Sequence, residues 1–455
     1  MEAGERDGVG TAVTPPVRAA GPATPGAVQV DGAGPPSPDG VPDTVPARSG
    51  TATWHRLGRA LAPAGVYLAV RLVGVAVLGL MAAARGNAVL AELRSWDGLW
   101  MLSIAGGGYA GVPTTLVDAF GRHTATTAYA FFPGYPAAVA VAGLLTGGDL
   151  LVAALLVSAA AGIAAAYGLT ALAAAVVQRR RDAGAPPVDP HRVGLLLVAL
   201  FAAAPMGVVL SMAYTEALFC ALAVWALVGA LRERWLLAGV CTAAAGLVRP
   251  TGSALVLAVG LAAAVAAADA LRPQGDDDGT GPEPARPHRA ASGPVLAVLL
   301  APAGLLAYLG FVGWRTGSPT GWFAIQSAGW GSQLDGGASL AAFVARVLVD
   351  GHELFDVAVL LALAGSLTLL AVAVRTRLPW PLLVYAAAVL ATVWLSDGQT
   401  HSRVRLLVPA FPLLIPVAVG LARRRPATAV AVVVAAALAS AWFGGYALTI
   451  WRYAI

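Results

Sequence analysis

The chain consists largely of long apolar segments, and clusters of arginine separate these segments. Hydrophobic residues make up 58% of the sequence and charged residues only 12%, about half the charged share of a soluble globular protein. Several apolar runs exceed the roughly 20 residues that cross a bilayer as one helix. The sequence therefore predicts an all-α polytopic membrane protein.

The remaining composition narrows the class of protein further. The chain contains no lysine, and its excess of Ala, Gly and Val indicates a GC-rich, bacterial coding sequence. The net charge of +5 does not indicate nucleic-acid binding, because the arginines cluster at predicted helix ends. Cys220 and Cys241 lie in apolar stretches and are predicted to pack as small core residues, without a disulfide or zinc framework.

Two parts of the chain differ in composition. Residues 1–53 are rich in Pro, Gly, Ala and Asp and lack apolar periodicity, so they are predicted to form a disordered tail. This tail is too long and too polar for a signal peptide, and we expect the first apolar segment to remain in the mature protein. Residues 54–455 are predicted to form one transmembrane domain, interrupted by a polar linker at 272–293.

Eleven membrane spans are predicted from the apolar runs. They lie at about 61–84, 150–177, 193–211, 214–231, 234–248, 251–271, 294–314, 354–374, 379–396, 402–421 and 426–449. Loops rich in arginine usually lie on the cytoplasmic side of a cell membrane. This rule predicts a cytoplasmic N-terminus and an external C-terminus. The loops at 85–149 and 315–353 are then external, and a short interfacial helix is expected at 339–349.

The segment 130–147 is expected to lie on the outer surface without crossing. An odd number of crossings must separate the first external loop from the cytoplasmic triplet Arg179-Arg180-Arg181, and the run at 150–177 supplies one. The segment begins Phe131-Phe132-Pro133-Gly134-Tyr135-Pro136, and its two prolines suit a juxtamembrane helix. The alternative is an ordinary transmembrane helix, which would place the arginine triplet outside.

An acidic residue beside tryptophan follows the first span. Leu93, Trp96, Trp100 and Ile104 recur at helical spacing, which predicts an amphipathic helix in the outer interface. Asp97 then lies at the water–lipid boundary, where a membrane enzyme would hold a general base. The alternative is a solvated surface charge.

Further polar residues are predicted to share this outer face. Glu216 and Arg249 lie deep in apolar sequence, where ionisable groups usually face a cavity or each other. Arg403 and Arg405 are predicted on the external side, where the positive-inside rule makes arginine uncommon. A lipid phosphate bound bidentately by these arginines would explain why they are there. For each of these residues, and for His401, the alternative is a helix-end side chain that reaches into the headgroups. The external loops add Tyr109, Asp118, Arg122, His123, Tyr214, Thr215, Trp322, Gln326, Trp330 and Asp397.

Five motifs in order resemble the GPI-anchor mannosyltransferase family of the PIG-V type and its bacterial relatives, in the C-type glycosyltransferase superfamily. They are Trp96-Asp97, Gly108-Tyr109, the segment 131–136, Tyr214-Thr215-Glu216-Ala217-Leu218-Phe219 and Arg249-Pro250-Thr251-Gly252. The resemblance runs from about residue 60 to 450 and is loose beyond 315. Ala217 stands where family members often have serine.

The resemblance implies an active site on the non-cytoplasmic side and a sugar donor linked to polyprenyl phosphate. It assigns Asp97 as the functional acid of the first external loop. Glu216 would position the sugar or acceptor, or share a divalent cation with Asp97; no cofactor is certain. The expected substrate-binding residues are Trp96, Tyr109, Glu216, Arg249, Gln326, Trp330, His401, Arg403 and Arg405.

A transporter or lipid flippase is the alternative function. It would predict inverted repeats and polar residues at mid-membrane depth, whereas no internal repeat is visible and the polar residues gather at one face. A lipid-linked donor also agrees with the absence of a glycine-rich nucleotide-binding motif. The sequence therefore favours an enzyme that acts on a lipid, glycan or protein acceptor. It fixes neither the acceptor nor the sugar.

Overall fold

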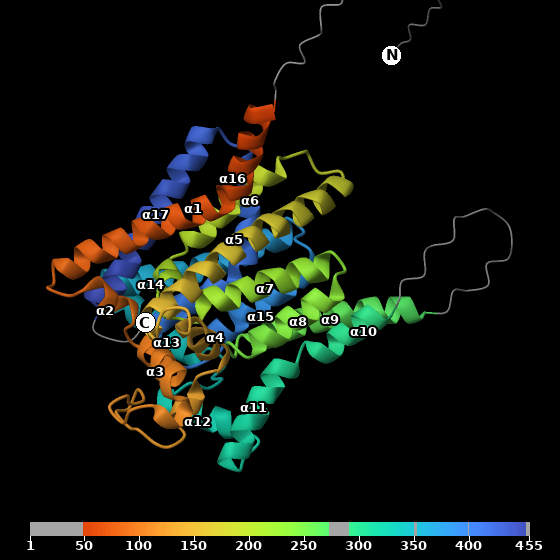
Figure 1. Cartoon of the computed structure of the whole chain (residues 1–455). Coiled ribbons are helices and arrows are strands. Elements are labelled where there is room, and N and C mark those ends of the chain that lie inside the picture. The colour runs from red at the N-terminus through yellow and green to blue at the C-terminus, as the bar shows by residue number, and fades with distance from the viewer. Residues whose placement is uncertain (1–48, 273–290, 350–352, 399, 452–455) are drawn as a thin grey trace, which may run out of the picture. The chain divides into compact units, whose positions relative to one another are not determined.

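The computed structural model describes residues 49–272, 291–349, 353–398 and 400–451. Most of the predicted tail at 1–53 and of the linker at 272–293 lies outside these described residues. Within them, every regular element is helical, and one isolated antiparallel bridge joins Leu334 and Ser396 (Figure 1). The all-α prediction is confirmed.

The described helices follow one another along the whole chain. In order they are α1 (Ser49–Ala83), α2 (Val89–Leu93), α3 (Asp97–Gly107), η1 (Tyr109–Gly111), η2 (Thr127–Ala130), α4 (Gly134–Gly143), α5 (Leu150–Asp182), α6 (Pro190–Ala202), η3 (Gly207–Ser211), α7 (Glu216–Leu231), α8 (Trp235–Gly246), α9 (Gly252–Leu271), α10 (Ser292–Leu300), α11 (Ala303–Thr316), α12 (Gly321–Trp330), α13 (Ala338–Val349), α14 (Leu354–Arg375), α15 (Trp380–Trp394), η4 (Thr400–Leu414), α16 (Ile415–Ala422) and α17 (Pro426–Thr449).

Each predicted span coincides with helical structure. Seven spans match helical stretches of 20 to 33 residues that are long and apolar enough to cross a bilayer. The other four match the shorter helices α6, α7, α8 and α15, which have 13, 16, 12 and 15 residues. At about 1.5 Å per residue these four helices are shorter than a roughly 30 Å hydrocarbon core. The chain is thus a multi-pass membrane protein in which four of the predicted spans have helices shorter than a bilayer core.

Proline explains two of the breaks in these helices. Pro302 separates α10 from α11, and Pro205 follows the end of α6, because proline has no N–H and its ring crowds the preceding turn. Figure 1 shows α11 bent away from the line of α10.

The helices pack around α5. It contacts α4, α6 and α7, while α7 packs on α8, and α15 packs on α9 and η4. Small residues permit the close approach: a Cβ on Gly168 of α5 would lie 2.4 Å from Val224 of α7. Without a hydrophobic force between helices in lipid, such small-residue contacts supply packing.

The segments between the predicted spans agree in part with expectation. The α4 helix within 130–147 has 10 residues and is shorter than a bilayer core, and its place in the outer interface stays a prediction. The expected helix at 339–349 is α13, whereas α12 was not expected. The single helix expected through Leu93, Trp96, Trp100 and Ile104 is instead two, because the chain turns at Trp96, which has a positive φ of 54°.

Candidate active site

Asp97 is the first residue of α3, directly after the turn at Trp96. The positive φ of Trp96 is rare for a residue with a side chain, and such strain tends to occur at functional sites. The turn is held by Tyr214: its hydroxyl accepts a hydrogen bond from the Asp97 amide (3.3 Å) and donates to the Ser95 carbonyl (3.3 Å). The Ala213 amide also donates to the Leu93 carbonyl (2.9 Å).

Arg405 forms an ion pair with Asp97. Its Nη1 lies 2.6 Å from Oδ2 of Asp97, and its guanidinium lies 5.5 Å from the centre of the Tyr214 ring. The Asp97 side chain is 28% exposed and that of Arg405 15%. Among the described residues, no hydrogen bond or ion pair involves Oδ1 of Asp97, so this oxygen can bond to a ligand.

A second ion pair lies beside the first. Nη1 of Arg249 contacts Oε1 of Glu216 and donates to the Thr215 hydroxyl at 2.9 Å. Glu216 is fully buried and Arg249 nearly so. Glu216 is also close enough to Arg405 for their charges to interact. We call Asp97, Glu216, Arg249 and Arg405 the charged site.

Two glycines allow the chain to form the turn that carries Arg249. A Cβ on Gly134 would lie 2.8 Å from the Leu247 carbonyl oxygen, to which the Gly134 amide donates. A Cβ on Gly252 would lie 2.9 Å from Cα of Gly246, where α8 turns into α9. Close packing beside Arg249 therefore explains why each of these two motifs contains a glycine.

A buried chain of hydroxyls supports the segment before Glu216. The Tyr135 hydroxyl lies 2.9 Å from the Ser158 hydroxyl, which donates to the Met212 carbonyl at 2.8 Å. These contacts connect α4, α5 and the non-helical stretch between η3 and α7. Buried polar groups that are fully paired hold one geometry, so this chain positions Tyr214 and Glu216.

The arginines retain unused donors. Among the described residues, Nε of Arg249, Nε of Arg405 and Nη1 of Arg403 are buried without a hydrogen-bond partner. Leaving a charged donor buried and unpaired is unfavourable, and an oxyanion is the natural partner of a guanidinium. The charged site is therefore chemically suited to an anionic ligand such as a phosphate.

Arg403 lies on another side of η4 from Arg405. Its Nη2 donates to the Ser339 hydroxyl (2.7 Å) and the Ser396 carbonyl (2.8 Å). The nearby Asp335 accepts from the amides of Gly337 and Ser339, and the hydrogen bonds to Ser339 and Gly337 lower the pKa of Asp335. Arg403 thus belongs to the start of α13 rather than to the charged site.

Tyr109 lies in an aromatic cluster with Tyr129, Tyr308 and Phe311. Its hydroxyl donates to the Phe131 carbonyl (2.8 Å) and lies 3.1 Å from the Tyr308 hydroxyl. Burial raises the pKa of Tyr109 above its ordinary value, so it stays protonated. Its contacts tie η1 to α11.

Gln326 and Trp330 of α12 contact the segment between α1 and α5. Gln326 Nε2 donates to the Ala130 carbonyl at 3.0 Å, and the Trp330 ring meets the edges of Trp100 and Phe131 at centroid distances of 6.2 and 5.6 Å. Trp100 follows Asp97 by one helical turn, so this aromatic group adjoins the proposed base. Trp96 itself is 38% exposed.

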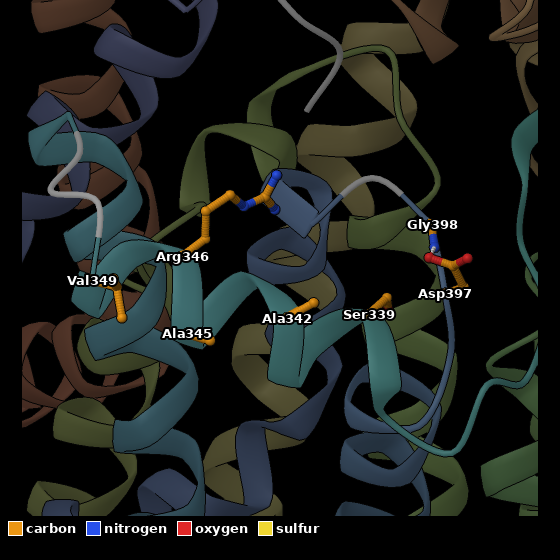
Figure 2. Close-up of a pocket in the computed structure, with 7 residues that line it drawn as sticks. All are labelled: Ser339, Ala342, Ala345, Arg346, Val349, Asp397 and Gly398. Carbon is orange, nitrogen blue, oxygen red and sulfur yellow. Dashed lines mark hydrogen bonds between the residues drawn. The ribbon is translucent and has the colours of Figure 1, made fainter.

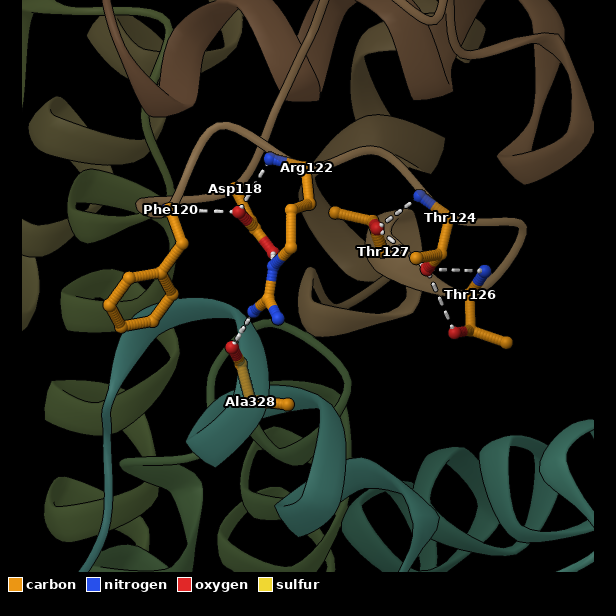
Figure 3. Close-up of polar contacts among 7 residues, drawn as sticks. All are labelled: Asp118, Phe120, Arg122, Thr124, Thr126, Thr127 and Ala328. Atoms are coloured by element: carbon orange, nitrogen blue, oxygen red, sulfur yellow. Dashed lines mark hydrogen bonds and ion pairs between the residues drawn. The ribbon is translucent and has the colours of Figure 1, made fainter.

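A salt bridge within the loop before η2 orients an arginine toward α12 (Figure 3). Asp118 accepts hydrogen bonds from the amides of Phe120 and Arg122, and Arg122 Nε lies 3.3 Å from its Oδ2. The Arg122 guanidinium also donates to the Ala328 carbonyl. The loop before η2 is thereby joined to α12.

The resemblance implies a substrate-binding role for His401 and allows a divalent cation at Asp97 and Glu216. His401 lies in η4, but its side chain is outside the part of the chain that the structure describes. Within the described ranges, no three His, Cys, Asp or Glu side chains gather as a metal site would require. Asp97 and Glu216 are each paired with an arginine instead.

Tyr214 and Thr215 were expected on the outer face but were not chosen as site residues. Their contacts with Asp97 and Arg249 now place both in the charged site's immediate surroundings. Their position directly before Glu216 in one of the five motifs was the available signal.

No protein-family model and no curated protein matches the chain. Among solved structures, it is similar to ArnT from Cupriavidus metallidurans bound to undecaprenyl phosphate, at 18% identity and a TM-score of 0.46 over 83% of this chain and 61% of that one. It is also similar to the oligosaccharyltransferase AglB from Archaeoglobus fulgidus, in complex with an inhibitory peptide and a dolichol-phosphate, at 14% identity and a TM-score of 0.43 over 84% of this chain and 56% of that one. The chain spans less than two thirds of the length of either.

Proposed function

We propose that this protein is a membrane glycosyltransferase that moves a sugar from a polyprenyl-phosphate donor to an acceptor hydroxyl. The observation that carries the proposal is the ion pair between Asp97 and Arg405, with one carboxylate oxygen open and an unused guanidinium N–H beside it. A base and an oxyanion binder are the two groups that such a transfer needs. The five ordered motifs, which include Asp97 and Arg249, point to the same chemistry.

Asp97 acts as the general base. As the acceptor oxygen attacks the anomeric carbon, its proton passes to Oδ1 of Asp97, the oxygen that Arg405 does not contact. The bond between the anomeric carbon and the phosphate oxygen breaks, and its electron pair leaves with the polyprenyl phosphate. Attack from the side opposite the leaving group inverts the configuration of the sugar.

Arg405 stabilises the leaving phosphate, with Arg249 behind it. Both guanidinium groups have an unpartnered Nε, and arginine binds phosphate oxygens through paired N–H groups. The existing partners, Asp97 and Glu216, keep both arginines in place before the donor binds. Glu216 is fully buried, so its role is to hold Arg249 and the shape of the site.

The sugar is proposed to be mannose, the acceptor a lipid, glycan or protein, and the reacting face external. The first of these follows the motif resemblance. The last follows the arginine distribution, which assigns the loops that hold Asp97 to the non-cytoplasmic side. The exposed apolar surfaces of α9, α10 and α14, which include Leu257, Leu299 and Leu361, suit contact with lipid chains.

The test is a transfer assay with the full chain in proteoliposomes. Polyprenyl-phosphate mannose, glucose and arabinose are supplied in turn with a membrane-lipid extract as acceptor, and the anomeric configuration of the product is read by NMR. We expect transfer from the mannosyl donor with inversion. No transfer from any donor would reject the enzyme and favour a transporter. Retention of configuration would reject the single displacement.

A further inference from the structure

An open cavity of about 770 Å³ lies between α13 and the turn that follows α15 (Figure 2). Ser339, Ala342, Ala345 and Arg346 line it from α13, and Asp397 lines it from the turn. Of these residues, Ser339 accepts a hydrogen bond from Arg403 and Asp397 is close enough for its charge to interact with Arg403, whereas none belongs to the charged site. The volume is within the roughly 300–1,000 Å³ of small-ligand sites.

The chemistry of the lining suits a neutral, hydroxyl-rich ligand. A hydroxyl group, a carboxylate and a guanidinium occupy the walls, so charges of both signs are present. The alanine methyl groups between them offer an apolar strip. Sugars present alternating hydroxyl groups and apolar C–H faces, and side chains of these kinds fix them by hydrogen bonds.

A buried arginine contacts the α13 wall of the cavity and, within the described part of the chain, keeps one N–H group without a hydrogen-bond partner. Arg403 is 3% exposed and donates through Nη2 to the hydroxyl of Ser339, which lines the cavity. Its Nη1, on the same planar fork, has no partner among the described residues. An unpaired buried charged donor is unfavourable, so a ligand oxygen near Ser339 would relieve it.

Two arginines of η4 contact the cavity wall and the charged site, although no described side chain of η4 lines the cavity. Arg403 and Arg405 are two residues apart on this 3₁₀-helix, whose residues advance by about 120° each, so their side chains leave on different sides. Arg405 reaches Asp97, and Arg403 reaches Ser339. A shift of η4 at one of these contacts would therefore be felt at the other.

We propose that the cavity under α13 binds a sugar unit of a glycan acceptor, beyond the unit whose hydroxyl reacts at Asp97. This inference rests on the proposed function for its role, but the binding itself does not require catalysis. It makes the acceptor a glycan rather than a simple alcohol. It also predicts that longer acceptors bind more tightly than single sugars.

The test uses mannotriose and methyl α-mannoside as probes, with the full chain in nanodiscs of sugar-free phospholipid. Ala342→Trp fills the cavity from an exposed position, and Ala341→Trp is the control, because Ala341 is exposed on α13 but does not line the cavity. We expect mannotriose to bind more tightly than methyl mannoside. We expect Ala342→Trp and Asp397→Asn each to weaken mannotriose binding at least about tenfold, with Ala341→Trp near wild type.

The outcomes separate this inference from the proposed function. Wild-type protein that binds neither probe, or Ala342→Trp protein that binds mannotriose like wild type, would overturn the inference. Equal weakening by Ala341→Trp and Ala342→Trp would also overturn it, because the loss would then reflect damage to α13. Mannotriose binding that depends on Ala342, without sugar transfer from any donor, would reject the proposed function alone.

Discussion

Arg405 holds Asp97 through a 2.6 Å contact between Nη1 and Oδ2, although the two residues come from η4 and the first turn of α3. The pair neutralises two charges at a half-buried position and leaves one oxygen of the carboxylate open. A donor phosphate would compete with Asp97 for the same guanidinium. Binding of the donor would thereby loosen the base as it becomes needed.

The role of Arg405 as a phosphate binder can be tested with Arg405→Lys. Lysine keeps the charge but loses the planar fork, so donor turnover should fall on the order of 100-fold, as when one oxyanion donor is removed. The measurement is kcat/KM for the mannosyl donor in proteoliposomes. Arg423→Lys is the control, because Arg423 is exposed beyond α16. Equal activity of Arg405→Lys and Arg423→Lys would remove Arg405 from the mechanism.

The buried pair of Glu216 and Arg249 should contribute strongly to the stability of the protein. Arg249→Met leaves the Glu216 carboxylate buried and unpaired, at a cost of about 3–5 kcal/mol. The double variant Glu216→Gln with Arg249→Met should regain most of that loss. Thermal unfolding in detergent micelles measures both.

An exposed pair supplies the control for this experiment. Arg272 pairs with Asp269 at side-chain exposures of 75% and 57%. Breaking it with Arg272→Met should change stability by about 0–1 kcal/mol, since solvent screens surface ion pairs. If Arg249→Met were as mild as Arg272→Met, the buried pair would not hold the site.

A glycine should be required at position 134, because the Leu247 carbonyl leaves no room for a side chain there. Gly134→Ala would place a methyl group 2.8 Å from the Leu247 carbonyl oxygen and 2.9 Å from the Val248 side chain, so we expect a loss of about 1–3 kcal/mol. Gly260→Ala in α9 meets nothing within 4 Å and should be neutral or stabilising by up to about 1 kcal/mol. The unfolding temperature should therefore fall for Gly134→Ala and stay the same or rise for Gly260→Ala.

The orientation in the membrane can be tested with reporter fusions after Gly148 and after Ala183. These residues flank α5, at whose C-terminal end the arginine triplet lies. We expect an external signal at Gly148 and a cytoplasmic one at Ala183, in agreement with the arginine distribution. A cytoplasmic signal at Gly148 would contradict the external assignment of the loop that carries Asp97.

The sequence alone predicted the helices well and the contacts poorly. Apolar length and arginine placement located all eleven helical regions, because these are local properties of composition. The break at Trp96 was missed, since its positive φ depends on the hydroxyl of Tyr214, a residue far along the chain. Local periodicity cannot report a contact of that kind.

The candidate site shows the same division. The ionisable residues Asp97, Glu216, Arg249 and Arg405 were identifiable because charge is rare in apolar sequence. Which acid pairs with which arginine, and that Arg403 faces α13 instead, depends on how η4 packs. The sequence also could not explain Gly134 in the motif at 131–136. The Leu247 carbonyl that leaves no room for a side chain there lies at the end of α8, far along the chain.

Asp97→Asn gives the most direct test of the central claim. Asparagine keeps the shape and the backbone hydrogen bond to Tyr214 but cannot accept the acceptor proton. Single-turnover transfer from polyprenyl-phosphate mannose is measured together with donor binding. We predict transfer reduced by about 10²–10⁴-fold with donor binding retained. Transfer at the wild-type rate would contradict the assignment of Asp97 as the base.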